Sequence, residues 1–268
     1  MGTQREPRIE RIRPDESGRV LDKRRIRRFY LLMLPVLLPL MFMGTGAIVI
    51  WGLEIPNGEV IGGVVAGVGF ILLVLYCIYE TCLIGYYPAQ CYLHWLRERI
   101  ERRPDAVVAA DDPDALFVQI IPREKWTVSM GENAADVGLL VIDKKRDQLR
   151  YEGDLERWTI PADCIRSFRL HSFTPPAGMA YLNEFTVVVL VVDMEDGEMW
   201  ETPLACQQVR FELWTGGKRR RGAELLRRAI GHLVDPDRWP AVDPEEMWPL
   251  RPRPSEPLEQ DFDDARRR

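Results

Sequence analysis

Three histidines are the first residues to consider for chemistry in this chain of 268 residues. They are His94, His171 and His232, and none has a Cys, Ser or Asp at a spacing typical of a catalytic triad or a metal site. Without such neighbours, each histidine is interpreted as structural or solvent-exposed. The histidines therefore predict no catalytic residue.

Cysteines and clustered acids give no stronger signal for a metal site. The five cysteines form no CxxC pair and no Cys/His spacing suited to zinc, which also argues against a disulfide framework; they are Cys77, Cys82, Cys91, Cys164 and Cys206. Cys82 and Cys91 have two open interpretations, acylation at a membrane edge or packing. The run Asp111-Asp112-Pro113-Asp114 could hold a cation, but its proline favours a turn.

We therefore expect no metal and no cofactor, and a protein that is not an enzyme. No glycine-rich phosphate motif follows a predicted strand. A membrane enzyme is a third and weaker alternative to the two functions given below.

One basic run is the best candidate for contact with a ligand. It consists of Lys218, Arg219, Arg220 and Arg221, with glycines on both sides, and it could bind phosphates of anionic lipid. Because cations oppose the dipole at a helix N-terminus, we expect them in the loop before the last helix. The alternative is a solvated charged face. Nucleic acid is not an expected partner, since the surrounding domain is acidic and lacks an aromatic stacking pattern.

A long segment without Lys or Arg indicates a membrane anchor. Residues 29–96 contain neither residue type, although arginines flank them on both sides. Two apolar runs, at about 29–53 and 61–84, are each long enough to cross roughly 30 Å of hydrocarbon, so residues 29–87 are predicted to be a two-helix transmembrane hairpin. A cleaved signal peptide is the rival interpretation of the first run.

Charges beside the hairpin set its predicted orientation. Lys and Arg are retained on the cytoplasmic side, and here they precede the first span and follow the second. We therefore expect a two-pass protein of the inner (plasma) membrane with both termini cytoplasmic, including a basic N-terminal tail at 1–28. The 31 Arg and 5 Lys indicate a GC-rich, bacterial genome.

Small residues in the second predicted span suggest close helix packing. Gly63 and Gly67 are four residues apart, which lets helix backbones approach each other. Packing against the first span and self-association are both open. Glu80 is either functional or placed at the interface, where water reaches it.

Residues 88–103 are predicted to form an amphipathic helix on the membrane surface. Leu93, Leu96 and Ile100 recur at helical spacing. The rest of the helix is basic, and four of its arginines are expected to contact anionic headgroups: Arg97, Arg99, Arg102 and Arg103.

From residue 104 to 235 the pattern changes to short alternating runs, which predict an antiparallel β domain. The predicted strands are Leu116–Ile121, Trp126–Met130, Gly138–Ile142, Gln148–Glu152, Arg157–Ile160, Ile165–His171, Phe185–Asp193 and Glu198–Pro203. Polar hairpin tips are expected at 143–147 and 194–197, and an amphipathic helix at 221–233. Residues 236–268 hold seven prolines and mixed charge, which predicts a disordered tail.

Three segments of this domain carry a family resemblance. They are Gly138-Leu-Leu-Val-Ile-Asp, Leu149-Arg-Tyr-Glu-Gly and Trp158-Thr-Ile-Pro-Ala-Asp-Cys-Ile-Arg-Ser-Phe. Their pattern resembles the pleckstrin-homology-like superfamily, including bacterial PH and GRAM-type domains, over about 115–234. The resemblance implies a small antiparallel barrel with a C-terminal helix, used to bind lipids, peptides or other proteins.

Together these features predict a membrane α-helical hairpin fused to a mainly-β soluble domain. The leading hypothesis is a non-catalytic PH-like cytoplasmic module for recognition or scaffolding at the membrane surface, with anionic headgroups or a protein as partner. The alternative is a subunit of an oligomeric membrane assembly, a pore or transporter accessory, packed through the glycine-rich second span.

Overall fold

The computed structural model describes residues 6–13, 19–21, 58–128, 133–175, 184–207, 209–210 and 215–252. The strands are β1 (Arg8–Arg11), β2 (Leu116–Ile120), β3 (Asp136–Asp143), β4 (Gln148–Gly153), β5 (Glu156–Pro161), β6 (Ile165–Phe173), β7 (Phe185–Asp193) and β8 (Met199–Cys206). The α-helices are α3 (Gly58–Glu101), α5 (Gly216–Val234) and α6 (Pro244–Met247). Three 3-10 turns, η1 (Arg123–Lys125), η2 (Ala162–Cys164) and η3 (Trp248–Leu250), complete the described elements.

Seven of the eight predicted strands form, and they follow the predicted antiparallel meander. Alternating apolar residues give each strand a face to bury, which is why the pattern was informative. The exception is Trp126–Met130. Its described residues lie in a turn after η1, where the Trp126 indole donates to the backbone oxygen of Ile121 at 2.9 Å.

The eight strands make one antiparallel sheet in the order β1-β5-β4-β3-β2-β8-β7-β6. Two meanders, β2 to β5 and β6 to β8, are joined where β2 pairs with β8. In the described part of the chain β1 and β6 are the two edges of this order, so the curled sheet stays open. The predicted small antiparallel PH-like barrel is thus corrected to an open, curled antiparallel sheet.

Hairpin tips form where turn residues were expected. Gly197 closes the β7–β8 tip with a φ of 78°, a left-handed conformation in which glycine avoids the clash of a Cβ. At the β3–β4 tip, Asp147 takes a φ of 50°. This tip projects the basic residues Lys144, Lys145 and Arg146, all exposed.

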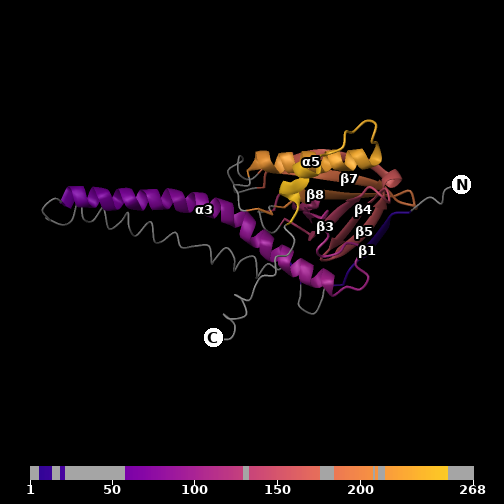
Figure 1. Cartoon of the computed structure of the whole chain (residues 1–268), viewed down its shortest axis with the longest axis horizontal. Helices are drawn as coiled ribbons and strands as arrows, with labels where there is room; N and C mark the ends of the chain where they lie inside the picture. Colours follow the sequence, from indigo (N-terminus) through magenta and orange to yellow (C-terminus); the bar gives the residue numbers. More distant parts are fainter. Residues whose placement is uncertain are drawn as a thin grey trace. The chain divides into compact units, whose positions relative to one another are not determined.

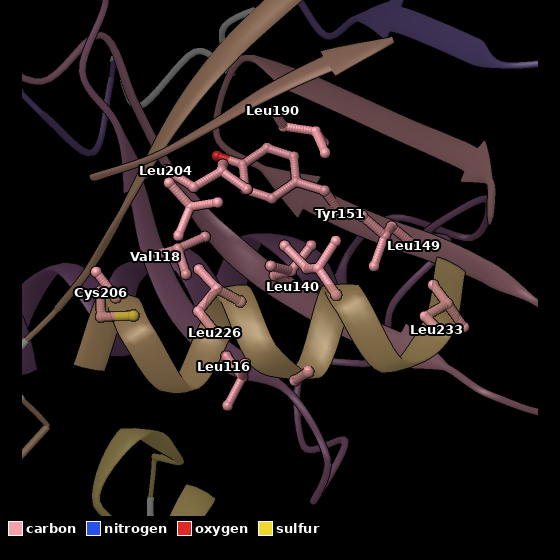
Figure 2. Packing of buried hydrophobic residues seen from close by; sticks show 14 of the residues in the cluster. Leu116, Val118, Leu140, Leu149, Tyr151, Leu190, Leu204, Cys206, Leu226 and Leu233 are labelled. Atoms are coloured by element: carbon pink, nitrogen blue, oxygen red, sulfur yellow. The ribbon is translucent and has the colours of Figure 1, made fainter. Parts of the chain in front are cut away.

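Helix α5 covers one face of the sheet, as Figure 1 shows. Its apolar stripe packs on inward-facing residues of the strands; Figure 2 labels Leu226 and Leu233 of the helix beside Leu116, Leu140 and Leu149 of the sheet. The predicted amphipathic helix at 221–233 is confirmed and begins five residues earlier. Thr215 is its N-cap, and the Thr215 side chain accepts a hydrogen bond from the Lys218 backbone N–H.

The opposite face of β2 and β3 is covered by the last turns of α3. Phe117, Val137 and Leu139 pack there in a second apolar cluster with Leu93 and Leu96 of the helix. Because successive side chains of a strand point to opposite faces, β2 is buried along its whole length, between α5 and the end of α3. The apolar stripe that suggested a helix on a lipid surface therefore packs on the sheet.

Helix α3 corrects the prediction of a transmembrane hairpin. It is one continuous helix of 44 residues that runs through Pro88 without a break, and its last turns belong to the β domain. Among the described residues no helix is long and apolar enough to cross a membrane. The predicted span at 61–84 is overturned by this finding, and the one at 29–53 lies outside the described residues.

The two-pass topology and the multi-pass inner-membrane localisation rested on those spans, so both are corrected with them. Residues 23–88 and 211–213 form a unit of their own, separate from the β-domain unit. In its described part α3 exposes eight apolar side chains, Val60, Val64, Val68, Phe70, Ile71, Leu72, Val74 and Leu75. A Cβ built on Gly63 or Gly67 would meet no atom within 4 Å, so no described segment packs against these glycines.

Both ends of the described chain contribute to the β domain. Residues 8–11, expected in a basic tail, form β1 and pair with β5, and Val20 is completely buried. In the C-terminal segment, Val242, Met247 and Leu250 join the core under α5. Part of the segment predicted to be disordered therefore packs on the fold, whereas residues 253–268 lie outside the described residues.

Candidate functional site

The candidate chemical residues of the sequence occupy structural positions. His171 stacks on Trp126 with ring centroids 4.4 Å apart, the Nδ1 atom of His232 lies 2.9 Å from the backbone oxygen of Trp239, and His94 is exposed. Within the described residues no group of three His, Cys, Asp or Glu side chains could hold a metal ion. The predicted absence of a catalytic centre remains a prediction.

The acidic run before β2 forms a turn. The Asp112 carboxylate accepts a hydrogen bond from the Asp114 backbone N–H at 2.9 Å, and Asp114 pairs with Arg251 at 3.1 Å. Among the cysteines, burial raises the pKa of Cys206 to about 12, which keeps its thiol protonated. The side chains of Cys77, Cys82 and Glu80 lie outside the described residues.

A buried ion pair fixes the end of α3 to the sheet. Arg99 and Asp154 are 6% and 2% exposed and form a hydrogen-bonded salt bridge. The second oxygen of Asp154 accepts the backbone N–H of Val20 at 2.8 Å. One carboxylate in the β4–β5 turn thereby joins three segments that are distant in sequence.

Glu152 organises a second group of charges beside this pair. The carboxylate is fully buried and accepts hydrogen bonds from Arg103 at 2.8 Å, from Arg157 at 2.9 Å and from the Val107 backbone N–H at 2.9 Å. Arg157 in turn pairs with Asp105. A buried carboxylate with this many donors is compensated for its lost hydration.

Asp136 holds the β4–β5 turn from the inside. Its carboxylate accepts backbone hydrogen bonds at 3.1 Å from residues 154, 155 and 156, and the Tyr151 hydroxyl donates to it at 3.2 Å. Burial, followed by repulsion from the Asp154 carboxylate, raises the pKa of Asp136 to about 7, although the backbone donors oppose the rise. Its hydrogen-bonding capacity is used internally, which indicates a structural role.

Asp136 also lines a cavity of about 520 Å³ at the start of β3. The charged side chains around this cavity nearly balance in sign: Arg11, Arg19, Arg123, Glu124, Asp136, Glu156 and Glu201. Arg123 and Glu201 form an ion pair with each other. The cavity therefore favours neither an anion nor a cation.

The four arginines expected on lipid have partners within the protein. Arg99 is buried as described, Arg103 also donates to the Gly153 backbone oxygen at 2.6 Å, and Arg97 donates to the Ala110 backbone oxygen at 3.0 Å. Arg102 is exposed and pairs with Glu98. Sequence reasoning missed the buried acids Asp136, Glu152 and Asp154. Asp136 begins β3, Glu152 lies in β4 and Asp154 lies in the turn after β4, and no local pattern marks these three acids as buried.

The basic run at 218–221 lies in the first turns of α5, where a loop was predicted. Arg219 turns back onto the domain, with its guanidinium carbon 4.6 Å from the Phe185 ring centroid, and burial lowers its pKa to about 10. Arg220 pairs with Glu224 at 3.1 Å, and the side chains of Lys218, Arg220 and Arg221 are all exposed. The run is therefore not a single cationic surface.

A groove of about 560 Å³ at the other end of α5 combines apolar and basic groups. It lies between the β3–β4 tip, the acidic turn before β2, and the C-terminal segment after α5. Its apolar lining consists of Leu116, Val141, Ile142, Ala229, Val242, Pro244 and Met247. We refer to this as the tip groove.

Charge at the rim of the tip groove is predominantly positive. The rim carries five cations and three carboxylates. The cations are Lys144, Lys145, Arg146, Arg150 and Arg251, and the carboxylates are those of Asp112, Asp114 and Asp143. Two of the acids are paired internally, Asp143 with Arg150 at 3.3 Å and Asp114 with Arg251 at 3.1 Å. Lys144 and Lys145 at the hairpin tip are exposed and are the cations that a ligand in the groove would meet.

Comparison with known proteins adds no relative. No family model matches the chain, and no curated protein and no solved structure matches it either. The predicted resemblance to the pleckstrin-homology-like superfamily, as a membrane-anchored fusion, is thus not supported by any of these comparisons.

Proposed function

We propose that the β domain is a non-catalytic recognition module that binds an acidic protein segment in the tip groove. The observation that carries the proposal is the combination, in one groove, of an apolar lining and a rim of exposed cations. An acidic segment with apolar side chains complements both, because its carboxylates meet the rim while its apolar groups contact the lining.

Three features of the groove favour a protein segment. Its volume of about 560 Å³ is within the range of pockets that accept several side chains or a small ligand. Most of the apolar lining, including Leu116, Ala229, Val242 and Met247, belongs to the packed core under α5, so it is preorganised for binding. The cations lie on a hairpin tip, where long side chains can adjust to carboxylates on an extended chain.

The test is fluorescence polarisation with the full chain and a labelled peptide of nine residues, carrying five carboxylates and a Leu and Phe four residues apart. The groove variant Lys144→Glu with Lys145→Glu should bind at least tenfold more weakly. The matched control, Lys218→Glu with Arg221→Glu, has the same change in charge outside the groove and should bind as the wild type does.

Three results would overturn the proposal. Equal loss in both variants would mean that net charge, and not the groove, governs binding. Preferential loss in the Lys218/Arg221 variant would assign binding to the start of α5. A parallel assay with phosphatidylglycerol vesicles tests lipid as the ligand. If the protein binds vesicles through Lys144 and Lys145 but does not bind the peptide, the ligand of the groove is an anionic headgroup and not a protein segment.

A further inference from the structure

Arg251 both lines the tip groove and stands next to the last described residue, Pro252. Its ion pair with Asp114 holds this point of the chain at the groove. Residues 253–268 follow in the sequence.

The sequence of this following segment has the chemistry that the groove complements. Between Ser255 and Asp264 it carries five acids and no cation: Glu256, Glu259, Asp261, Asp263 and Asp264. Leu258 and Phe262 lie among them, four residues apart. The segment thus combines carboxylates with two apolar side chains.

Chain length permits the contact. Glu256 is four residues from Pro252, and an extended chain covers at most about 3.5 Å per residue, or roughly 14 Å over this distance. A segment attached so close to its site has an effective concentration in the millimolar range, so even weak intrinsic binding is sufficient for occupancy.

We propose that residues 255–264 of the same chain bind in the tip groove and regulate it by competing with external acidic segments. This inference rests on the proposed function, because it names an occupant for the same groove. The carboxylates meet Lys144 and Lys145, while Leu258 and Phe262 contact the apolar lining.

The main experiment compares binding of the acidic peptide described above to three full-length proteins. The tail variant carries Glu259→Gln, Asp261→Asn and Asp263→Asn. Its control, Glu124→Gln with Glu198→Gln and Asp237→Asn, loses three exposed acids that do not line the groove. A tethered competitor at about 1 mM with a Kd of about 0.1 mM weakens an external ligand about tenfold.

The tail variant should therefore bind the peptide about tenfold more tightly than the wild type, and the control should not. Phe262→Ser, which leaves the charge unchanged, should give part of this gain. If all of these proteins bind the peptide equally, self-occupancy is overturned and the proposed function stands. If none binds it, even with the tail acids neutralised, the proposed function itself is overturned.

Zero-length carbodiimide crosslinking then identifies the occupant directly. The experiment uses an equal mixture of isotopically light and heavy full-length chains. If each chain binds its own segment, the crosslinks from Lys144 or Lys145 to acids of 256–264 join two residues that carry the same label. Mixed-label crosslinks would mean that a second copy supplies the segment. Absence of crosslinks to these acids would overturn the inference.

Discussion

Arg99, near the end of α3, and Asp154, in the turn between β4 and β5, form an ion pair that is almost completely removed from solvent. Asp154 also receives the Val20 backbone N–H, so the pair connects the N-terminal segment, the helix and the sheet. The arginine that the sequence placed on a lipid surface is thus part of the interior of the domain.

Breaking this pair should destabilise the protein strongly. Arg99→Ala leaves the Asp154 carboxylate buried without its cation, and the expected loss is about 3–5 kcal/mol in the free energy of unfolding. Urea denaturation of the full chain measures it. Arg102→Ala, which removes an exposed pair from the same helix, should cost less than about 1 kcal/mol. Similar losses in the two variants would contradict the buried role of Arg99.

The raised pKa of Asp136 predicts a dependence of stability on pH. In the unfolded chain the pKa of Asp136 has its ordinary value of 3.8, whereas in the folded protein its pKa is about 7. Between these two pH values Asp136 is therefore protonated more in the folded state than in the unfolded state. Stability from this group is therefore greatest below about pH 4, falls as pH rises toward 7, and is constant above that, with a slope of at most about 1.4 kcal/mol per pH unit.

Unfolding free energies at several pH values between 4 and 8 check the prediction, with Asp136→Asn as the comparison. The asparagine variant should lose stability more slowly with rising pH than the wild type, whatever its absolute stability. Parallel curves for the two proteins would show that Asp136 does not titrate in this range.

Two glycines of α5 should respond differently to alanine. A Cβ at Gly231 would lie 2.4 Å from the Trp239 ring, whereas at Gly217 its nearest neighbour is 3.8 Å away. Gly231→Ala should cost about 1–3 kcal/mol through overpacking, and Gly217→Ala should be neutral or slightly stabilising. Thermal unfolding followed by circular dichroism distinguishes the two. A neutral Gly231→Ala would mean that Trp239 does not pack tightly there.

The thiols of Cys164 and Cys206 should differ in reactivity. Cys206 is buried with a pKa of about 12, while Cys164 is partly exposed, so a variant that retains only Cys164 should react with iodoacetamide in the folded state. A variant that retains only Cys206 should react only in denaturant. Mass spectrometry after timed labelling gives both rates, and rapid labelling of folded Cys206 would show that this part of the core opens.

Patterns within short windows of sequence were sufficient for most of the β domain. Alternation of apolar and polar residues located seven strands, the Asp196-Gly197 pair located a tight turn, and the stripe of leucines located α5. These predictions succeed because the period of side-chain direction is a local property of the backbone. The same patterns located the cationic tip of the β3–β4 hairpin.

What the apolar stripes pack against was decided only by tertiary structure. A stripe such as Leu93, Leu96 and Ile100 has the same sequence whether it meets lipid or a sheet, and only the fold shows that it meets β2 and β3. The charged network and the tip groove likewise bring together residues that are distant in sequence. Val107 and Glu152 are 45 positions apart, and the pairs Val20 with Asp154 and Asp114 with Arg251 are each more than 100 positions apart. Such contacts depend on how the strands and helices pack in three dimensions, which no local period in the sequence records.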